Sequence, residues 1–396
     1  MQPVSITNDW KCLHNHGRGG ALVKQKNFIL TACLMILLAG CNKLETSKHV
    51  AHSAESITLR VGTGVGTTHL IYTAYLSKWM EEVENRTNGK VNFEVHYGGS
   101  VVAMGREYDA LVSGIVDMVM PMFQVYDPVR FPLSEVSMLP LLESNVTTAS
   151  AAYKELVMGN LPLKEGKSFY DYELKSKGLK MWTTPTTEGY NFSYANKKGP
   201  RNLTELTNVT FRSSGRVAEI FSKEIGINAI AMPAGDIYDG LSRGSIDGLY
   251  FSIPDWPGYG IDELLGYTIQ GVNLGHFSHI FGMTQETWES LPHDVQEVMD
   301  EVAAELLDSK ETYQFYEERM EQALNNNKKK GGVIEDMSAQ PLEVQEAIDK
   351  AIVETWKKWI KMNDENGLPG KETALMWRDL IIKHGGDVPE EIKQMK

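Results

Sequence analysis

Alternating apolar and polar residues predict the first elements of the folded body. Residues 57–66 read ITLRVGTGVG, a strand pattern that runs into a glycine-rich turn. Residues 69–90 space their apolar side chains three and four apart and end near a glycine, which predicts a helix. Residues 91–97, VNFEVHY, alternate again. Strand, helix and strand in this order form the unit of a parallel α/β sheet.

A short phrase occurs twice in the chain. YDALVSGIVDM returns 130 residues later as YDGLSRGSIDG, with Tyr, Asp, Leu, Gly and Asp at the same spacing. Each copy predicts a short helix closed by a glycine, Gly114 or Gly244, because glycine accepts the left-handed conformation of a helix end. An apolar strand follows, entered at Asp117 or Asp247. Both copies follow α/β elements, so the repeat predicts two similar α/β lobes that face each other.

The last third of the chain is predicted to be helical. Residues 291–327 carry an amphipathic pattern and predict one long helix. About 35 residues at 1.5 Å each would extend roughly 50 Å, which is longer than one lobe, so this helix is expected to brace both lobes. Shorter helices are expected over residues 341–362 and 372–384.

The first 40 residues predict a signal peptide of the lipoprotein type. Lys24 and Lys26 precede an apolar run that ends in Leu-Ala-Gly-Cys at Cys41. The run is shorter than the roughly 20 residues that cross a bilayer. Its ending resembles a bacterial lipobox, in which the cysteine is lipidated after cleavage, although an ordinary signal peptide with an incidental cysteine stays open. Residues 41–56 are polar and aperiodic and predict a flexible tether behind a lipid anchor on the membrane.

Composition narrows the classes of function. With 42% hydrophobic and 23% charged residues, the chain has the composition of a soluble globular protein. A formal net charge of −13 argues against a nucleic-acid partner, which needs a basic face. The three cysteines are Cys12, Cys33 and Cys41, so cleavage before Cys41 would leave no second thiol for a disulfide or a zinc site.

Catalytic motifs are missing from the sequence. It contains no H-E-x-x-H, no G-x-S-x-G and no phosphate-binding G-x-x-x-x-G-K-[ST] pattern. The glycines of GTGVGTTH lack the third glycine of a dinucleotide loop, so we interpret them as a turn beside a ligand cleft. His276 and His279 are close in sequence but are expected to be structural or surface residues rather than a metal pair. We therefore expect no cofactor, no metal and a binding protein rather than an enzyme.

Residues 208–248 carry the most specific pattern. They read NVTFRSSGRVAEIFSKEIGINAIAMPAGDIYDGLSRGSIDG and resemble the solute receptors of tripartite ATP-independent periplasmic (TRAP) transporters, the DctP-like family. The matching positions are Phe211-Arg212, Ile225-Gly226, Met232-Pro233, Asp236, Tyr238, Leu241, Gly244 and Asp247-Gly248.

The resemblance implies an α/β fold like that of periplasmic binding proteins, with two lobes, a hinge cleft and a bracing C-terminal helix. Lobe I is expected to comprise residues 57–188 and 278–317, and lobe II residues 189–277 and 318–396. A small organic acid would bind between the lobes in the periplasm and pass to TRAP membrane subunits driven by an ion gradient. A receptor for an ATP-driven importer, or a ligand-sensing lipoprotein, remains open as an alternative.

Arg212 is the principal candidate for ligand binding. The resemblance places the family's carboxylate-binding arginine there, and an arginine at the end of an α/β strand faces the crevice where ligands bind. Its planar guanidinium can hold a carboxylate with two hydrogen bonds. Arg216, one helical turn later, is expected to be structural or peripheral.

The remaining candidates follow from the resemblance or from their position after strands. Where many family members have an arginine after a glycine, this chain reads Gly189-Tyr190-Asn191, which favours a monocarboxylate, with an aromatic or amine-bearing tail, over a doubly charged ligand. Asn191 is expected to donate an amide hydrogen bond, and Asn273 matches a family asparagine that contacts ligand. The positional candidates are His69, Phe123, Gln124, Ser252, Asp255 and Trp256. Asp255 is expected either to pair with an amine or to cap the next element, and Trp256 either to stack on the ligand or to pack at the hinge.

Overall fold

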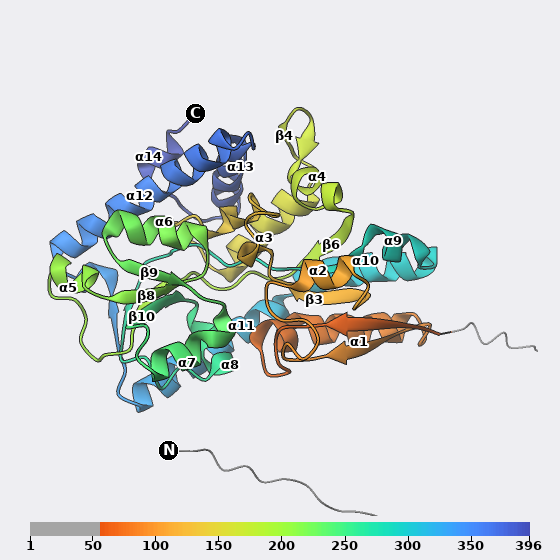
Figure 1. The fold of residues 1–396 in the computed structure, drawn as a ribbon, viewed down its shortest axis with the longest axis horizontal. Coiled ribbons are helices and arrows are strands. Elements are labelled where there is room, and N and C mark those ends of the chain that lie inside the picture. Colours follow the sequence, from red (N-terminus) through yellow and green to blue (C-terminus); the bar gives the residue numbers. More distant parts are fainter. Residues whose placement is uncertain (1–55) are drawn as a thin grey trace, which may run out of the picture. The chain divides into compact units, whose positions relative to one another are not determined.

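The computed structural model describes residues 56–396 (Figure 1). The predicted signal peptide, Cys41 and all but the last residue of the predicted tether lie outside the described residues. Within the described range, every helix is too short or too polar to cross a bilayer.

The first sheet has five strands in the order β2-β1-β3-β12-β6. Strand β1 is parallel to β2 and β3, whereas β12 runs antiparallel to β3 and β6. The strands are β1 (Ile57–Gly62), β2 (Val91–His96), β3 (Met118–Met122), β6 (Leu179–Thr183) and β12 (Ile280–Thr284). The predicted strand-helix-strand unit at the start of the body is confirmed, with π-helix η1 (Tyr72–Leu76) and α1 (Ser77–Arg86) between β1 and β2.

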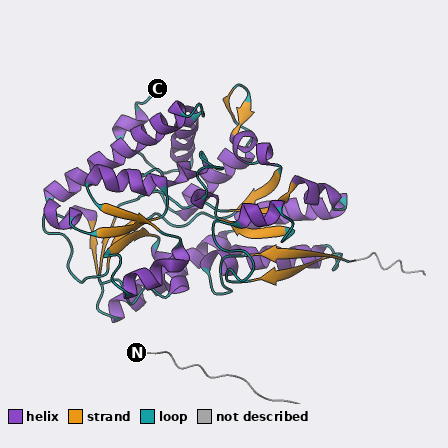
Figure 2. Ribbon diagram, in the orientation of Figure 1, coloured by secondary structure: helices purple, strands orange, loops and turns teal. Residues whose placement is uncertain are grey.

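The second sheet has six strands in the order β13-β11-β7-β10-β8-β9. Here β8 lies parallel to β9 and β10, and β7 runs antiparallel to β10 and β11. The strands are β7 (Asn191–Tyr194), β8 (Thr210–Ser213), β9 (Asn228–Ala231), β10 (Gly248–Phe251), β11 (Tyr267–Gln270) and β13 (Val333–Asp336). Figure 2 shows the two groups of strands apart from each other, each flanked by helices.

Helices surround both sheets. Those that follow α1 are α2 (Glu107–Val112), α3 (Val146–Met158), α4 (Phe169–Glu173), α5 (Leu203–Thr207), α6 (Arg216–Ile225), α7 (Ile237–Ser242), α8 (Trp256–Tyr259), α9 (Gln285–Ser290), α10 (His293–Leu307), α11 (Lys310–Lys329), α12 (Leu342–Glu365), α13 (Gly370–Lys383) and α14 (Glu390–Lys393). A small hairpin joins β4 (Pro162–Lys164) to β5 (Lys167–Ser168). The predicted α/β class with two lobes is therefore confirmed. The residue boundaries given above for the lobes stay a prediction.

The repeated phrase has the same structural role in each sheet. Gly114 and Gly244 close α2 and α7 in the left-handed conformation, with φ of 69° and 66°. The aspartate that follows accepts a hydrogen bond from the backbone N–H of the neighbouring parallel strand. Asp117 accepts from Arg60 N at 2.8 Å, and Asp247 accepts from Thr210 N at 2.8 Å. Each copy thus fixes the start of the strand after it against the strand beside it.

The single long helix predicted over residues 291–327 is wrong. Helix α10 ends at Leu307 and α11 begins at Lys310, and Ser309 between them is extended, with φ −72° and ψ 126°. Side chains of α11 satisfy the carbonyls that the break leaves free, because Thr312 Oγ1 and Tyr313 OH donate to the Leu306 and Leu307 carbonyls at 3.0 and 2.7 Å. Ser and Asp compete with helical hydrogen bonding, which favours a break at this point.

Helix α11 nevertheless connects the two halves of the structure. It packs against η1, which follows the first strand of the first sheet, and against 3₁₀-helix η6 (Ile253–Asp255), which follows β10 of the second sheet. Helix α11, the second part of the predicted long helix, therefore connects the two lobes as the long helix was expected to do.

Candidate functional site

A small buried cavity of about 10 Å³, with room for about one water molecule, lies between the two sheets. Its lining comes from both halves of the chain, and most of the side chains are buried. The lining residues are His69, Phe123, Tyr126, Thr187, Tyr190, Ala234, Phe251, Asp255, Tyr259, Phe277 and His279. The buried walls and the contribution of both sheets are the arrangement of a ligand site closed between lobes.

Arg212 lies beside this cavity with its side chain fully buried at 0% exposure. Strand β8 positions it, and its Nε donates to the Met232 carbonyl at 2.9 Å. Its Nη2 donates to the Tyr126 hydroxyl at 3.0 Å, and its guanidinium lies 5.5 Å from the Phe251 ring centre. No carboxylate of the described residues lies within 4.0 Å of it, so this buried cation has no anionic partner in residues 56–396. A buried charge is costly unless it is paired, so the Arg212 guanidinium stays the principal candidate for binding an anion.

Tyr126 joins the two lobes at the cavity wall. It belongs to the 3₁₀-helix η2 (Gln124–Tyr126) that follows β3 of the first sheet. Its hydroxyl accepts both the Arg212 hydrogen bond and one from Ala234 N at 3.1 Å, and both donors belong to the second half. The same residue therefore orients the buried arginine and holds the lobes together.

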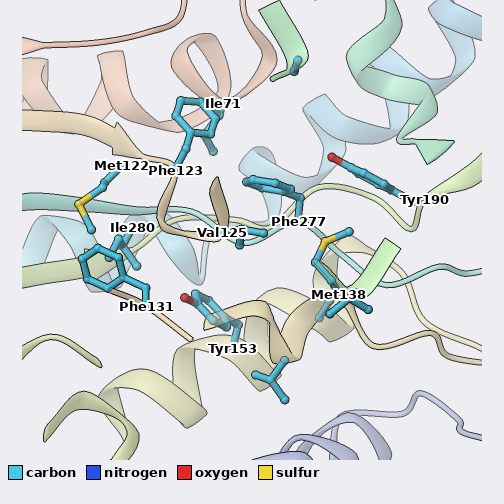
Figure 3. Packing of buried hydrophobic residues seen from close by; sticks show 14 of the residues in the cluster. Ile71, Met122, Phe123, Val125, Phe131, Met138, Tyr153, Tyr190, Phe277 and Ile280 are labelled. Carbon is cyan, nitrogen blue, oxygen red and sulfur yellow. The ribbon is translucent and has the colours of Figure 1, made fainter. Parts of the chain in front are cut away.

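Aromatic rings form most of the remaining wall. Figure 3 shows Phe277 between Phe123 and Tyr190. Its ring centre lies 6.2 Å from that of Phe123 and 6.5 Å from that of Tyr190. Tyr126 stacks on Phe123 at 5.8 Å, and Phe251 meets Tyr190 at 5.5 Å. Such a lining suits a flat apolar body better than a polyhydroxylated one.

Two titratable side chains of the wall keep polar atoms without partners. Asp255 is 5% exposed, and its buried Oδ2 has no hydrogen-bond partner among residues 56–396. Burial raises its pKa to about 6, and the nearby Ser252 hydroxyl and Arg319 oppose this shift. His279 is 4% exposed with its Nδ1 unpaired, and burial lowers its pKa to about 4, so its ring is neutral. The cavity therefore offers a carboxylate and a neutral imidazole besides the arginine.

A hydrogen bond between His69 and Tyr259 closes another side of the cavity. Ile71 N donates to His69 Nδ1 at 3.3 Å, so the neutral ring carries its proton on Nε2 and donates it to the Tyr259 hydroxyl at 2.9 Å. Burial lowers the pKa of His69 to about 3, which keeps the ring neutral. The Tyr259 hydroxyl proton is consequently free to point to an acceptor in the cavity.

The structure brings together only part of the predicted site. Phe123, His69 and Asp255 line the cavity, and Arg212 contacts its wall. Ser252 and Trp256 are fully buried at 0% exposure next to Asp255, with the Ser252 hydroxyl and the Trp256 indole N–H unpaired. Gln124 points elsewhere, because its Nε2 donates to the Tyr153 hydroxyl at 3.0 Å and to Ser278.

Asn191 and Asn273 line a separate hollow of about 210 Å³. The Asn191 amide donates to the Gly189 carbonyl at 2.9 Å, and the Asn273 amide donates to the Ser144 carbonyl at 3.3 Å. Asn273 Oδ1 accepts from Gly275 N at 3.0 Å, as expected of a turn asparagine. Neither side chain lies in the wall of the cavity beside Arg212.

Sequence reasoning missed most of the aromatic wall. Tyr126 and Phe277 follow residues that the sequence did single out, but nothing in the pattern separates a cavity ring from a core ring. His276 and His279, which were expected to be structural or surface residues, are both buried; His276 bonds to Asn273 and the Thr187 carbonyl, whereas His279 lines the cavity. Within residues 56–396, no group of three His, Cys, Asp or Glu side chains is placed to hold a metal ion.

Comparison with known proteins identifies the family. Residues 61–362 match the family described as bacterial extracellular solute-binding protein, family 7, also called DctP. The chain therefore belongs to this family, and the resemblance noted in residues 208–248 is confirmed.

Individual relatives are distant. A solute-binding protein of Albidiferax ferrireducens is 20% identical over 239 residues, which cover 57% of this chain and 64% of that relative. The chain thus matches somewhat less than two thirds of the length of this curated relative.

Two solved structures share the fold. A TRAP solute-binding protein from Rhodoferax ferrireducens, in complex with copurified benzoate, has a TM-score of 0.70 and 21% identity, covering 83% of this chain and 98% of that one. A marine metagenome TRAP solute-binding protein specific for aromatic acid ligands, in complex with metahydroxyphenylacetate, has a TM-score of 0.72 and 22% identity, covering 83% and 100%.

Proposed function

We propose that this protein is the extracytoplasmic receptor of a TRAP transporter and binds a small monocarboxylate with an aromatic body. The observation that carries the proposal is the buried Arg212, which has no anionic partner among residues 56–396 and contacts the aromatic wall of the cavity. The carboxylate would bind the guanidinium, and the rings of Phe123, Tyr190 and Phe277 would enclose the body. The aromatic acids bound by the two similar structures support this ligand class.

The wider role follows from the family. The receptor would act in the periplasm, held to the membrane by a lipid on Cys41, and would pass its ligand to ion-gradient-driven TRAP membrane subunits. Lobe closure would bury the ligand, because residues of both sheets form the cavity. In this role the protein would bind the ligand and deliver it without changing it chemically.

Titration calorimetry of the full chain against benzoate, phenylacetate, a C4-dicarboxylate and a sugar acid tests the proposal. We expect an aromatic monocarboxylate to bind most tightly. Arg212→Ala is expected to weaken it by about a hundredfold or more, because a charged hydrogen bond and its ion pair are lost together. Arg201→Ala, on the exposed surface of the same lobe, is the matched control. Near-normal affinity of Arg212→Ala would refute the assignment.

A further inference from the structure

Arg212 and Asp255 are two buried side chains of opposite charge at the same cavity. Arg212 is 0% exposed and Asp255 is 5% exposed, and neither forms an ion pair with another of the described residues. They do not neutralise each other, since no contact of 4.0 Å or less joins them. Buried charges without a partner are rare because desolvation is costly. Arg212 and Asp255 together therefore indicate a ligand that carries one negative and one positive group.

The surroundings of Asp255 favour a cation at that point. Burial raises the pKa of the Glu188 carboxyl to about 7, and the nearby charges of Asp255 and Glu317 add to this shift. The one cation whose charge acts on Asp255 is Arg319, and its own Nη2 donates to the Thr68 carbonyl at 2.7 Å. His69 and His279 are neutral and add no positive charge. Negative groups thus outnumber positive ones on this side of the cavity.

We infer that the ligand is a zwitterion, in which a protonated amine binds Asp255 while the carboxylate binds Arg212. This inference rests on the proposed function, and it narrows the ligand class from aromatic monocarboxylates to those that carry an ammonium group. A primary ammonium offers three hydrogen-bond donors. Asp255 Oδ2, which has no hydrogen-bond partner among residues 56–396, can accept one of them, and the Tyr259 hydroxyl lines the same cavity.

The experiment compares three isosteric probes with the full chain. 3-(Aminomethyl)benzoate, 3-(hydroxymethyl)benzoate and 3-ethylbenzoate have nearly the same shape and differ in one terminal group, and the 4-substituted set covers the other geometry. Titration calorimetry at pH 7.5 gives the affinities. We expect the better aminomethyl isomer to bind at least about tenfold more tightly than its ethyl counterpart, as the pairing of a desolvated charge requires.

Asp255→Asn supplies the second comparison, because the amide keeps the side chain's volume and removes its charge. We expect it to weaken the aminomethyl probe by about tenfold or more and to leave 3-ethylbenzoate within about threefold. Asp239→Asn, an exposed aspartate of the same lobe, is the matched control and should change neither. A melting curve of each variant verifies that it folds.

The outcomes separate this inference from the proposed function. If the ethyl or hydroxymethyl probe binds as tightly as the aminomethyl probe, and binding depends on Arg212, the zwitterion is refuted while the carboxylate receptor stands. If Asp255→Asn weakens all three probes equally, Asp255 shapes the cavity and does not bind an amine. If no probe binds at millimolar concentration, the proposed aromatic carboxylate function fails, and this inference fails with it.

Discussion

Arg216 Nη2 and Glu135 Oε2 form an ion pair at 2.7 Å that joins the two lobes. Glu135 lies on the 3₁₀-helix η3 (Ser134–Met138) of the first half and is 0% exposed, while Arg216 begins α6 of the second half. The backbone N–H of Arg216 also donates to Glu135 Oε1 at 3.0 Å. The structural role expected of Arg216 is thus an ion pair across the lobes.

We predict that Arg216→Ala weakens the closed form more than the fold of either lobe. The change leaves the Glu135 carboxylate without its cation in the closed state, and removing one partner of a buried pair is strongly destabilising. Ligand affinity is expected to fall by about tenfold or more, since closure and binding are coupled. Small-angle scattering with saturating ligand should show a larger radius of gyration than the parent protein has. A variant that closes normally and binds normally would contradict the coupling.

Tyr126→Phe is predicted to weaken ligand binding while it keeps the aromatic wall. The variant loses one hydroxyl that accepts two hydrogen bonds across the lobes, from Arg212 and from Ala234 N. Two lost hydrogen bonds of about 1 kcal/mol each correspond to a roughly tenfold to thirtyfold loss of affinity. Calorimetry measures it. Tyr172→Phe, which removes an exposed hydroxyl at a 3.3 Å contact with the Lys164 carbonyl, serves as the control and should bind like the parent.

Asp255 should make the stability of the ligand-free protein depend on pH. Burial raises its pKa from the ordinary 3.8 to about 6 in the folded state. The folded protein therefore holds this proton more tightly than the unfolded chain does, and stability falls as pH rises from about 4 to about 6. Above pH 6 this loss is complete. The groups around Asp255 that carry or acquire charge are Glu188, Glu317 and Arg319, with His69 neutral above about pH 4.

Asp255→Asn is expected to remove this loss. At about pH 3 the Asp255 side chain is mostly protonated in both the folded and the unfolded parent protein, so chemical unfolding there should give nearly the same free energy for the variant and the parent. At pH 7 the ligand-free variant is expected to be more stable by about 1–3 kcal/mol, the equivalent of a shift of one to two pKa units. When the unfolding free energy of the parent is subtracted from that of the variant at each pH, the contributions of most other titrating groups cancel. A variant that is less stable than the parent at pH 7 would show that the carboxylate is paired in the ligand-free protein.

The two aspartates of the repeated phrase should contribute alike to stability. Asp117→Ala and Asp247→Ala each leave a backbone N–H of the neighbouring strand without its acceptor, at an expected cost of about 1–2 kcal/mol. Asp117 also holds the Arg60 guanidinium at 2.8 Å, but the Arg60 side chain is 45% exposed, so solvent screening should leave this ion pair with little effect on stability. Urea unfolding of both variants and of Arg60→Ala checks this. If Arg60→Ala alone strongly destabilises the protein, the Arg60–Asp117 ion pair contributes more than the hydrogen bond from Asp117 to the backbone.

The sequence predicted the architecture because the fold depends on local patterns. Strand alternation, helix spacing and the two glycine-closed phrases each act within a few residues, and the structure places β1, α2, α7 and β10 close to where they were expected. The break between α10 and α11 escaped prediction because its compensation comes from Thr312 and Tyr313, whose side chains do not disturb the amphipathic pattern.

The cavity was harder to predict than the fold. Arg212, Phe123, His69 and Asp255 were predicted because each follows a strand or matches the family pattern. Tyr126, Tyr190 and Phe277 reach the cavity through turns and through chain crossings between the lobes, whose direction a sequence does not specify. Asn191 and Asn273 were predicted as ligand contacts from their places in the sequence. In the structure their side-chain amides donate to the backbone carbonyls of Gly189 and Ser144 instead.

The enclosed cavity also sets how fast a ligand can be exchanged. Its walls come from both sheets and are mostly buried, so a bound molecule cannot leave while the lobes are together. Release of a ligand then requires the Tyr126–Arg212 hydrogen bond and the Glu135–Arg216 ion pair to break first, however strongly the ligand binds Arg212. The residence time is therefore a property of the two lobes, and chemically different ligands of similar size should dissociate with rates that share one upper limit, the rate of opening.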